Sequence, residues 1–272
     1  MLNNKNLNNQ PFISPDKLVS FLSGKNKNIS GIHLVDPKVE LIAMTSPTLV
    51  DVSENFQYDL NKTIESFIED AGRTCYKSFD KKAEGTDKKF CNMLLNSGHT
   101  SVFEHASATF RIICSRSVLA ELTRHRLASY SVQSQRFVNY RKNGGGISFI
   151  RPSWISWEDI DSTYETISSE DPTLITPTSI FLNSLFKCNV EYARLLDLGW
   201  KPEQAREILP NCTATEIVMT ANFREWINVL NQRSDTNPAA YSEIKIIANQ
   251  IAKILVDVSP TIFKQFKEIN NL

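Results

Sequence analysis

Residues 124–136 read RHRLASYSVQSQR and form the densest set of candidate ligand-binding groups in the chain. The Arg-His-Arg triplet ends a helix predicted over 117–126. An extended segment over 131–138 then brings Ser134 and Arg136 onto one face, because strand residues two apart point the same way. A hydroxyl beside a guanidinium suits a phosphate. Cations also favour helix C-termini, so dipole capping explains the triplet about equally well.

Outward from this stretch, the hydrophobic pattern predicts interleaved helices and strands. The predicted strands cover 39–44, 106–114, 131–138, 147–150 and 213–221. The predicted helices cover 14–24, 61–71, 86–98, 117–126, 177–198, 202–209, 223–233, 239–256 and 261–269. Residues 154–176 are acidic and are expected to be an irregular surface insertion. Among nine glycines there is no GxGxxG or GxxxxGK[ST], so side chains must hold any nucleotide.

The composition is ordinary for a globular protein. The chain has 272 residues, 41% hydrophobic and 22% charged, which suits one large or two small domains. It has no apolar run long enough to span a membrane and no secretory signal at its N-terminus, so we expect a cytoplasmic protein without a membrane partner.

Charge is concentrated in one segment although the formal net charge is zero. Residues 111–151 hold seven arginines and one lysine against a single acid, Glu121. Neutral overall charge disfavours a general nucleic-acid binder. A local basic segment instead suggests an anion site for a small-molecule phosphate, with a solvated basic face as the plain alternative. Arginine dominance favours the anion site, because the guanidinium fork suits phosphate.

The cysteine pattern does not suggest a disulfide-bonded or zinc-bound protein. There are five cysteines, far apart and without a CxxC, so neither a disulfide scaffold nor a zinc knuckle is expected. Cys75 has no apparent activating base in the sequence and is not expected to be a nucleophile. A metal site at His99 and His105 is also not expected, because their spacing lacks companion ligands.

Three further segments join residues 124–136 in a recognisable order. They are GHTSVFEH at 98–105, REILP at 206–210, and NFREWIN at 222–228 with Arg233 after it. Together with RHR, seven residues and Ser134, this order resembles the flavin-dependent thymidylate synthases, over roughly residues 71–266. The resemblance implies an α+β fold with a central antiparallel-rich sheet flanked by helices, one domain per subunit, assembled as a homotetramer with shared active sites. Residues 39–272 are expected to form the catalytic domain, after a leader over 1–38 with a short accessory helix.

The resemblance also implies an activity. It is a methyltransferase activity, the synthesis of dTMP from dUMP, with methylenetetrahydrofolate as carbon donor and NADPH-reduced FAD as hydride donor. The residues that the resemblance assigns to FAD are Ser101, Glu104, Arg124, His125, Arg126, Asn222, Arg224 and Asn228. Those assigned to dUMP are Glu121, Arg124, Ser134, Gln135, Arg136, Arg206 and Arg233. Those expected to act in catalysis are Arg233, Arg206 and His99.

Two observations qualify this assignment: the position of Arg233 on its helix, and three departures from the family pattern. Arg233 lies about 140° round the helix from Asn228 and is not expected on the same face. The sequence also departs from the family at Glu121, commonly Gln, at Phe137, usually Tyr, and at 237–241, where a His-Ala-Gln-like segment is usual. A carboxylate near a phosphate repels it, so Glu121 is expected to pair with Arg124 or to bind something else.

Other interpretations stay open. Singly, Glu104 could pair with a surface arginine, Arg224 could be a solvated helix residue, and Asn222 could be only a helix cap. As a whole, the chain could be a flavin- and nucleotide-binding protein without turnover. It could also bind RNA through its arginines, although it lacks an aromatic stacking platform among them.

Overall fold

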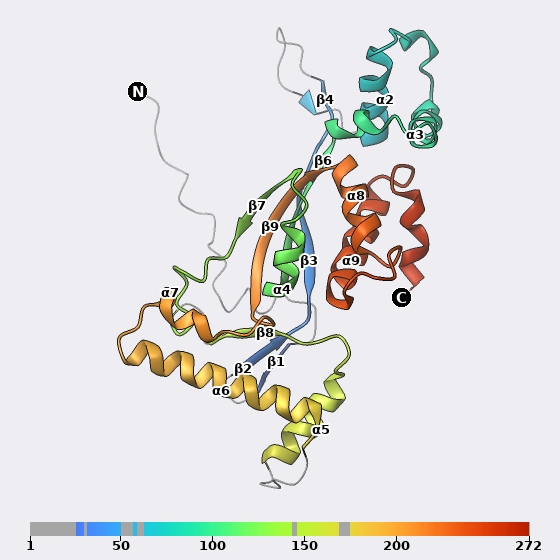
Figure 1. Ribbon diagram of the computed structural model, residues 1–272. Coiled ribbons are helices and arrows are strands. Elements are labelled where there is room, and N and C mark those ends of the chain that lie inside the picture. The colour runs from blue at the N-terminus through green and yellow to red at the C-terminus, as the bar shows by residue number, and fades with distance from the viewer. Residues whose placement is uncertain are drawn as a thin grey trace, which may run out of the picture. The chain divides into compact units, whose positions relative to one another are not determined.

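The computed structural model describes residues 26–29, 32–49, 57–58, 63–142, 146–168 and 175–271. They fall into two compact units, coloured by residue number in Figure 1. Unit 1 comprises residues 1–36 and 134–214, and unit 2 comprises residues 37–133 and 215–272. The sequence led us to expect one domain per subunit, whereas contacts divide the chain in two. The boundary after residue 38 stays a prediction, and the leader helix over 14–24 lies outside the described residues.

Unit 2 is built on a four-stranded sheet in the order β3-β6-β9-β7. Its elements are β3 (Lys38–Met44), β4 (Thr48–Leu49), β5 (Gln57–Tyr58), α2 (Ile64–Thr74), η1 (Phe79–Lys81), α3 (Thr86–Asn96), η2 (Thr100–His105), β6 (Ser107–Ser115), α4 (Arg116–Leu122), β7 (Ala128–Val132), β9 (Ala214–Asn222), α8 (Phe223–Arg233), α9 (Ser242–Val258) and η4 (Lys264–Asn271). The β3–β6 and β7–β9 pairs are antiparallel. The predicted mixed fold with an antiparallel sheet is confirmed.

Alternation along β6 and β9 decides which face of the sheet is covered. Along most of both strands every second residue is buried, so one face packs on helices while the other carries mainly polar side chains. Figure 1 shows α8 and α9 together along one side of the sheet. Trp226 of α8 is fully buried there, packs edge-on against Phe110 of β6 at 5.0 Å between ring centroids, and donates to the Ala108 carbonyl at 3.1 Å. Burial of one such aromatic contributes roughly 1.5–3 kcal/mol.

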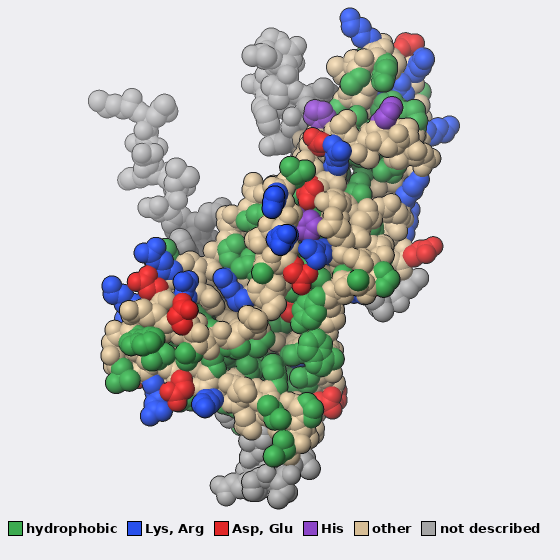
Figure 2. All heavy atoms as spheres, viewed as in Figure 1, with side chains coloured by type: hydrophobic (Ala, Val, Ile, Leu, Met, Phe, Trp, Pro, Cys, Tyr) green, Lys and Arg blue, Asp and Glu red, His purple; other side chains and the backbone are tan. Residues whose placement is uncertain are grey.

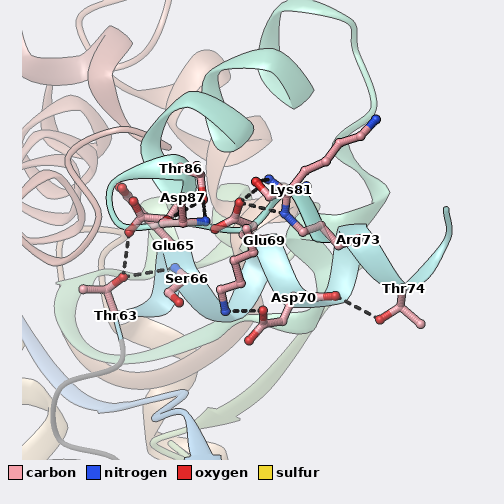
Figure 3. A network of polar contacts seen from close by, with 12 residues as sticks. Thr63, Glu65, Ser66, Glu69, Asp70, Arg73, Thr74, Lys81, Thr86 and Asp87 are labelled. Carbon is pink, nitrogen blue, oxygen red and sulfur yellow. Dashed lines mark hydrogen bonds and ion pairs between the residues drawn. The ribbon is translucent and has the colours of Figure 1, made fainter. Parts of the chain in front are cut away.

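A buried ion pair within α2 orients an arginine that binds the segment after the helix (Figure 3). Glu69 and Arg73 lie one helical turn apart, with side chains 1% and 8% exposed and a 2.7 Å contact. The Arg73 guanidinium also donates to the carbonyls of Ser78 and Lys81, so it closes the loop after the helix. Gly72 permits the close packing of α2 on α3, because a Cβ there would lie 2.5 Å from the Phe90 ring.

Unit 1 combines a small sheet with helices. Its elements are β1 (Asn26–Ile29), β2 (Ile32–Val35), β8 (Ser148–Ile150), α5 (Trp157–Ser168), α6 (Pro177–Asp197), α7 (Pro202–Ala205) and η3 (Arg206–Ile208). The strand order is β1-β2-β8, with β1–β2 antiparallel and β2–β8 parallel. Thr176 begins α6 through a capping box with Ser179, and Pro177 occupies its first turn.

Two predicted elements differ from the structure. Residues 157–168 form α5 rather than an irregular insertion. Ser156 and Asp159 cap each other through hydrogen bonds of 3.0 and 3.3 Å, so the acidic residues mark a helix start. The strand predicted over 131–138 has the wrong bounds, because the observed strand β7 covers Ala128–Val132. Strand β7 ends at Val132, where its pairing with β9 ends, and residues 135–137 form a turn.

Among the described residues, no helix is long and apolar enough to cross a membrane. The same residues contain no cluster of three or more potential metal-ligating His, Cys, Asp or Glu side chains.

Candidate active site

The Arg-His-Arg segment is a fixed turn between α4 and β7, not the end of a helix as predicted. The Tyr130 hydroxyl, from β7, donates to the carbonyls of Leu122 at 2.8 Å and His125 at 2.6 Å. Burial raises the pKa of Tyr130 to about 12, so the hydroxyl remains a donor. The turn buries His125 and exposes Arg124 and Arg126 on either side of it.

His125 lies between a cation and an anion. Arg233 Nε donates to His125 Nε2 at 3.2 Å, and His125 Nδ1 lies 3.4 Å from a Glu225 carboxylate oxygen. Burial lowers the pKa of His125, Arg233 lowers it further, and Glu225 opposes the shift. Since an arginine offers only donors, Nε2 must be unprotonated and the ring proton must sit on Nδ1. His125 is therefore a neutral imidazole that donates to Glu225.

Arg233 is also paired with Glu121, the residue that departs from the family pattern. Its Nη1 donates to the Glu121 carboxylate at 2.8 Å, and its Nη2 donates to the Glu121 carbonyl at 3.4 Å. The two side chains are 20% and 33% exposed. Of the two possibilities stated for Glu121, pairing with Arg124 is therefore wrong. The carboxylate instead occupies an arginine that the resemblance assigns to dUMP.

Helix α8 and the 3₁₀ helix η2 bring a second set of predicted residues together. Arg224 of α8 pairs with Glu104 of η2, and both side chains are about half exposed. The Asn222 side chain caps α8 by accepting from the Glu225 N–H at 2.8 Å, so its capping role is confirmed. Asn228 donates to the Glu225 carboxylate at 3.3 Å. Arg224 and Arg233 thus have different partners, as expected from their places round the helix.

The glycine that opens the GHTSVFEH motif sets its direction. Gly98 has a φ of +72°, a left-handed conformation that favours glycine, and it turns the chain from α3 into η2. His99 and Ser101 follow and are exposed. Figure 2 shows basic, acidic and histidine side chains intermixed on one face of unit 2, over α4 and the neighbouring strands.

The remaining predicted substrate residues belong to unit 1. Ser134 and Arg136 do not share a strand face as predicted. Ser134 lies just before a turn that contains Arg136, and its hydroxyl accepts from the Arg136 N–H at 3.2 Å. The exposed Arg136 side chain pairs with Glu203 at 2.9 Å, and Arg206 lies 3.5 Å from Glu207. Gln135 is half-buried beside them. These residues form local pairs within unit 1.

Sequence analysis did not single out Glu225 or Glu203. Glu225 stands three residues after Asn222, and this spacing is the signature of a capping box, which would have marked it as a first-turn acid. Its contact with His125 joins residues 100 apart in the chain, which no local pattern reveals. Glu203 has only the general preference for acids in a first helical turn.

Burial keeps three of the five thiols in the protonated form. Cys91 and Cys114 are buried, which raises their pKa well above the usual range, and burial raises the pKa of Cys188 to about 11. Cys75 is exposed and lies at the C-terminal cap of α2.

The donor set fits the dinucleotide cofactor implied by the motifs. Arg124 and Arg126 are exposed, and within the described part of the chain neither guanidinium has an ion pair or a hydrogen bond. Two such cations suit a pyrophosphate. The Glu104–Arg224 pair and the amides of Asn222 and Asn228 add donors and acceptors on the same unit. The residues present are therefore compatible with FAD.

Comparison with known proteins agrees with the motifs. The sequence model of the Thy1 family, described as thymidylate synthase complementing protein, matches residues 58–261. The chain is 34% identical to the flavin-dependent thymidylate synthase of Corynebacterium efficiens over 251 residues, covering 86% of this chain and 91% of the relative. It is 33% identical to that of Geobacter sulfurreducens over 207 residues, covering 74% and 81%.

A solved structure shares the fold. The UMP/dUMP methylase PolB from Streptomyces cacaoi, bound with 5-Br dUMP, matches with a TM-score of 0.63 at 23% identity, over 86% of this chain and 95% of that chain. The motifs, the family model and the similar sequences lead to one conclusion: the chain belongs to the flavin-dependent thymidylate synthase family.

Proposed function

We propose that this chain synthesises dTMP from dUMP, with methylenetetrahydrofolate as carbon donor and NADPH-reduced FAD as hydride donor. The observation that carries the proposal is the hydrogen-bonded chain Glu121–Arg233–His125–Glu225, which lies beside the exposed Arg124 and Arg126. These contacts hold Arg233 and a neutral His125 in place through side chains of the protein itself. Residues 39–272 would form the catalytic domain.

The residues of unit 2 would hold the flavin. Arg124 and Arg126 would bind its pyrophosphate, and Glu104, Ser101, Asn222, Arg224 and Asn228 would bind its other polar groups, with His125 behind them. Bound and reduced FAD supplies the hydride, which no side chain can deliver. His99, which is exposed after Gly98, would lie where the folate or the nicotinamide reaches the flavin.

A second set of residues would hold dUMP. Ser134, Gln135 and Arg136 would bind the nucleotide together with Arg206 and Arg233. Arginines there would bind the phosphate and polarise the uracil carbonyls, which favours the negative charge that builds on the ring. Glu121 would leave or share Arg233 when dUMP binds, because a carboxylate and a substrate anion or carbonyl compete for the same donors.

Burial argues against a nucleophilic role for three of the five cysteines. Burial raises the pKa values of Cys91, Cys114 and Cys188, and Cys75 lies at the C-terminal cap of α2. We therefore infer that binding, orientation and charge stabilisation are the tasks of the protein. The likeness to the family further implies a homotetramer whose active sites combine residues of several subunits. A monomer with full activity in gel filtration would contradict that assembly.

The proposal is tested by following dTMP formation from dUMP by mass spectrometry, with FAD, NADPH and methylenetetrahydrofolate. We expect dTMP only when all three are present. A folded protein that binds FAD and dUMP but forms no dTMP would contradict the proposal and would support a flavin- and nucleotide-binding protein without turnover.

A further inference from the structure

Glu225 is the one acid at the centre of the unit 2 network to which the motifs assign no role. It lies in the first turn of α8 and is 5% exposed. Its carboxylate faces His125 Nδ1 at 3.4 Å and accepts from the Asn228 amide at 3.3 Å with both oxygens. Its backbone N–H donates to the Asn222 side chain at 2.8 Å. One buried residue therefore contacts three residues that are expected to hold the flavin.

The contact with His125 decides which nitrogen of the imidazole carries its proton. A neutral imidazole has one donor and one acceptor nitrogen, and either can take the proton. Arg233 Nε donates to Nε2 at 3.2 Å, which requires a lone pair on that nitrogen. The proton must then sit on Nδ1, in a buried place where an unmatched N–H is costly. Glu225 supplies the matching acceptor.

The charged groups that face His125 come from two helices. Arg233 and Glu225 lie on α8, and Glu121, the other partner of Arg233, lies on α4. Tyr130, from β7, binds the His125 carbonyl rather than its ring. Arg233 and burial lower the pKa of His125 more than Glu225 raises it, so the ring stays neutral. Glu225 thus sets the tautomer of His125 without making the ring a cation.

We propose that Glu225 is a positioning residue of this enzyme: it holds His125 in the tautomer that accepts from Arg233, and thereby fixes the Arg233 guanidinium for dUMP. Glu225 does not contact the substrate itself; it orients His125, which in turn orients Arg233. The proposal rests on the proposed role of Arg233 with dUMP. The tautomer part of it does not depend on turnover.

The tautomer is measured by nitrogen-15 NMR of the folded protein without substrate. The chain has only four histidines, and the spectrum of His125→Gln assigns the signal. At neutral pH we expect His125 with a protonated Nδ1 and an unprotonated Nε2, while the exposed His105 serves as an internal reference. A protonated Nε2 in the wild-type protein would overturn the proposal before any variant is made.

Two substitutions separate positioning from a general structural role. Glu225→Leu removes the acceptor at similar volume, so we expect His125 to shift toward the Nε2-protonated tautomer and the KM for dUMP to rise about tenfold, with a smaller change in kcat. Glu225→Gln keeps an acceptor oxygen, and Asn228 can turn its amide to match. We expect that variant to restore the tautomer and to bring the KM back to within about threefold of wild type.

The outcomes are decisive in each case. A wild-type tautomer in Glu225→Leu overturns the proposal whatever the kinetics. If that variant does not fold, Glu225→Gln still tests the contact: loss of the nearby negative charge must lower the pKa of His125 below its wild-type value, and an unchanged pKa overturns the proposal. Glu191→Gln, an exposed acid of α6, is the matched control and should change neither readout.

Failure of the proposed function looks different. A wild-type protein that shows the expected tautomer but forms no dTMP contradicts the proposed reaction and leaves the Glu225–His125–Arg233 geometry standing. A protein that forms dTMP with the opposite tautomer contradicts the role of Glu225 alone.

Discussion

Two arginines of unit 2 and two arginines of unit 1 are held in different ways. In unit 2, Arg73 and Arg233 are largely buried, and each is bound by three groups from other turns of the fold. In unit 1, Arg136 and Arg141 are more than half exposed, and each pairs with one acid on the surface. A buried, multiply bonded guanidinium has one position. An exposed one with a single partner can exchange that partner for a ligand at little cost. Arg73 and Arg233 are therefore fixed in position, whereas Arg136 and Arg141 can change partners.

The largest expected effect concerns stability. Glu69→Ala leaves Arg73 as a buried charge without its carboxylate, so we expect the free energy of unfolding to fall by about 3–5 kcal/mol. Asp197→Ala removes the partner of the exposed Arg141 and should cost under about 1 kcal/mol. Urea denaturation of both variants measures the difference. Equal losses would show that the buried and the exposed ion pair do not differ in their contribution to stability.

The second effect concerns substrate binding. Arg233 donates from Nε, Nη1 and Nη2 to three separate atoms, a geometry that a lysine cannot reproduce. We expect Arg233→Lys to lower kcat/KM for dUMP about 100-fold, and Arg136→Lys to lower it less than about tenfold, because an exposed single contact tolerates an ammonium. Steady-state kinetics check the ranking, and the reverse ranking would refute it.

The third effect is a pH dependence carried by His125. Its pKa is lowered in the folded state by burial and by Arg233, so the unfolded chain takes up the proton first as pH falls. Stability should therefore decrease as pH drops from about 6.5 toward the lowered folded pKa. His125→Gln should remove this part of the slope, whereas His105→Gln, on the surface, should keep it. Thermal unfolding at a series of pH values gives both slopes.

The smallest effect concerns Glu121. Its pair with Arg233 is partly exposed, so we expect Glu121→Gln to release the arginine for substrate and to tighten dUMP binding about threefold. Isothermal titration of dUMP measures the change. Weaker binding would mean that Glu121 helps to hold the nucleotide rather than competing with it.

Much of the fold is predictable from the sequence because local signals coincide with tertiary structure. Strand β6, helix α6 with its Thr176 cap, strand β9 and helix α8 with its Asn222 cap all appear where alternation, capping residues and periodicity place them. Residues 131–138 fail because strand ends depend on pairing, and β7 pairs with β9 only up to Val132.

The sequence predicts which residues belong to the site, but it does not predict which of them contact one another. The motifs indicate Glu104 and Arg224, and the structure brings them into one ion pair. They do not indicate that Arg233 pairs with Glu121, or that Glu225 holds His125, because these contacts join α4, the following turn and α8 across the fold. Such contacts follow from the packing of α4 and α8, which no short sequence window contains.

Release of tritium from dUMP labelled at C5 tests the central claim most directly, because it reports the loss of the C5 proton that dTMP synthesis requires. With FAD, NADPH and methylenetetrahydrofolate present, the account predicts release by the wild-type protein and by Cys75→Ala, and loss of nearly all release in Arg233→Ala. Release that survives in Arg233→Ala but disappears in Cys75→Ala would contradict it, because a protein thiol, and not an arginine-bound nucleotide beside a flavin, would then carry the reaction.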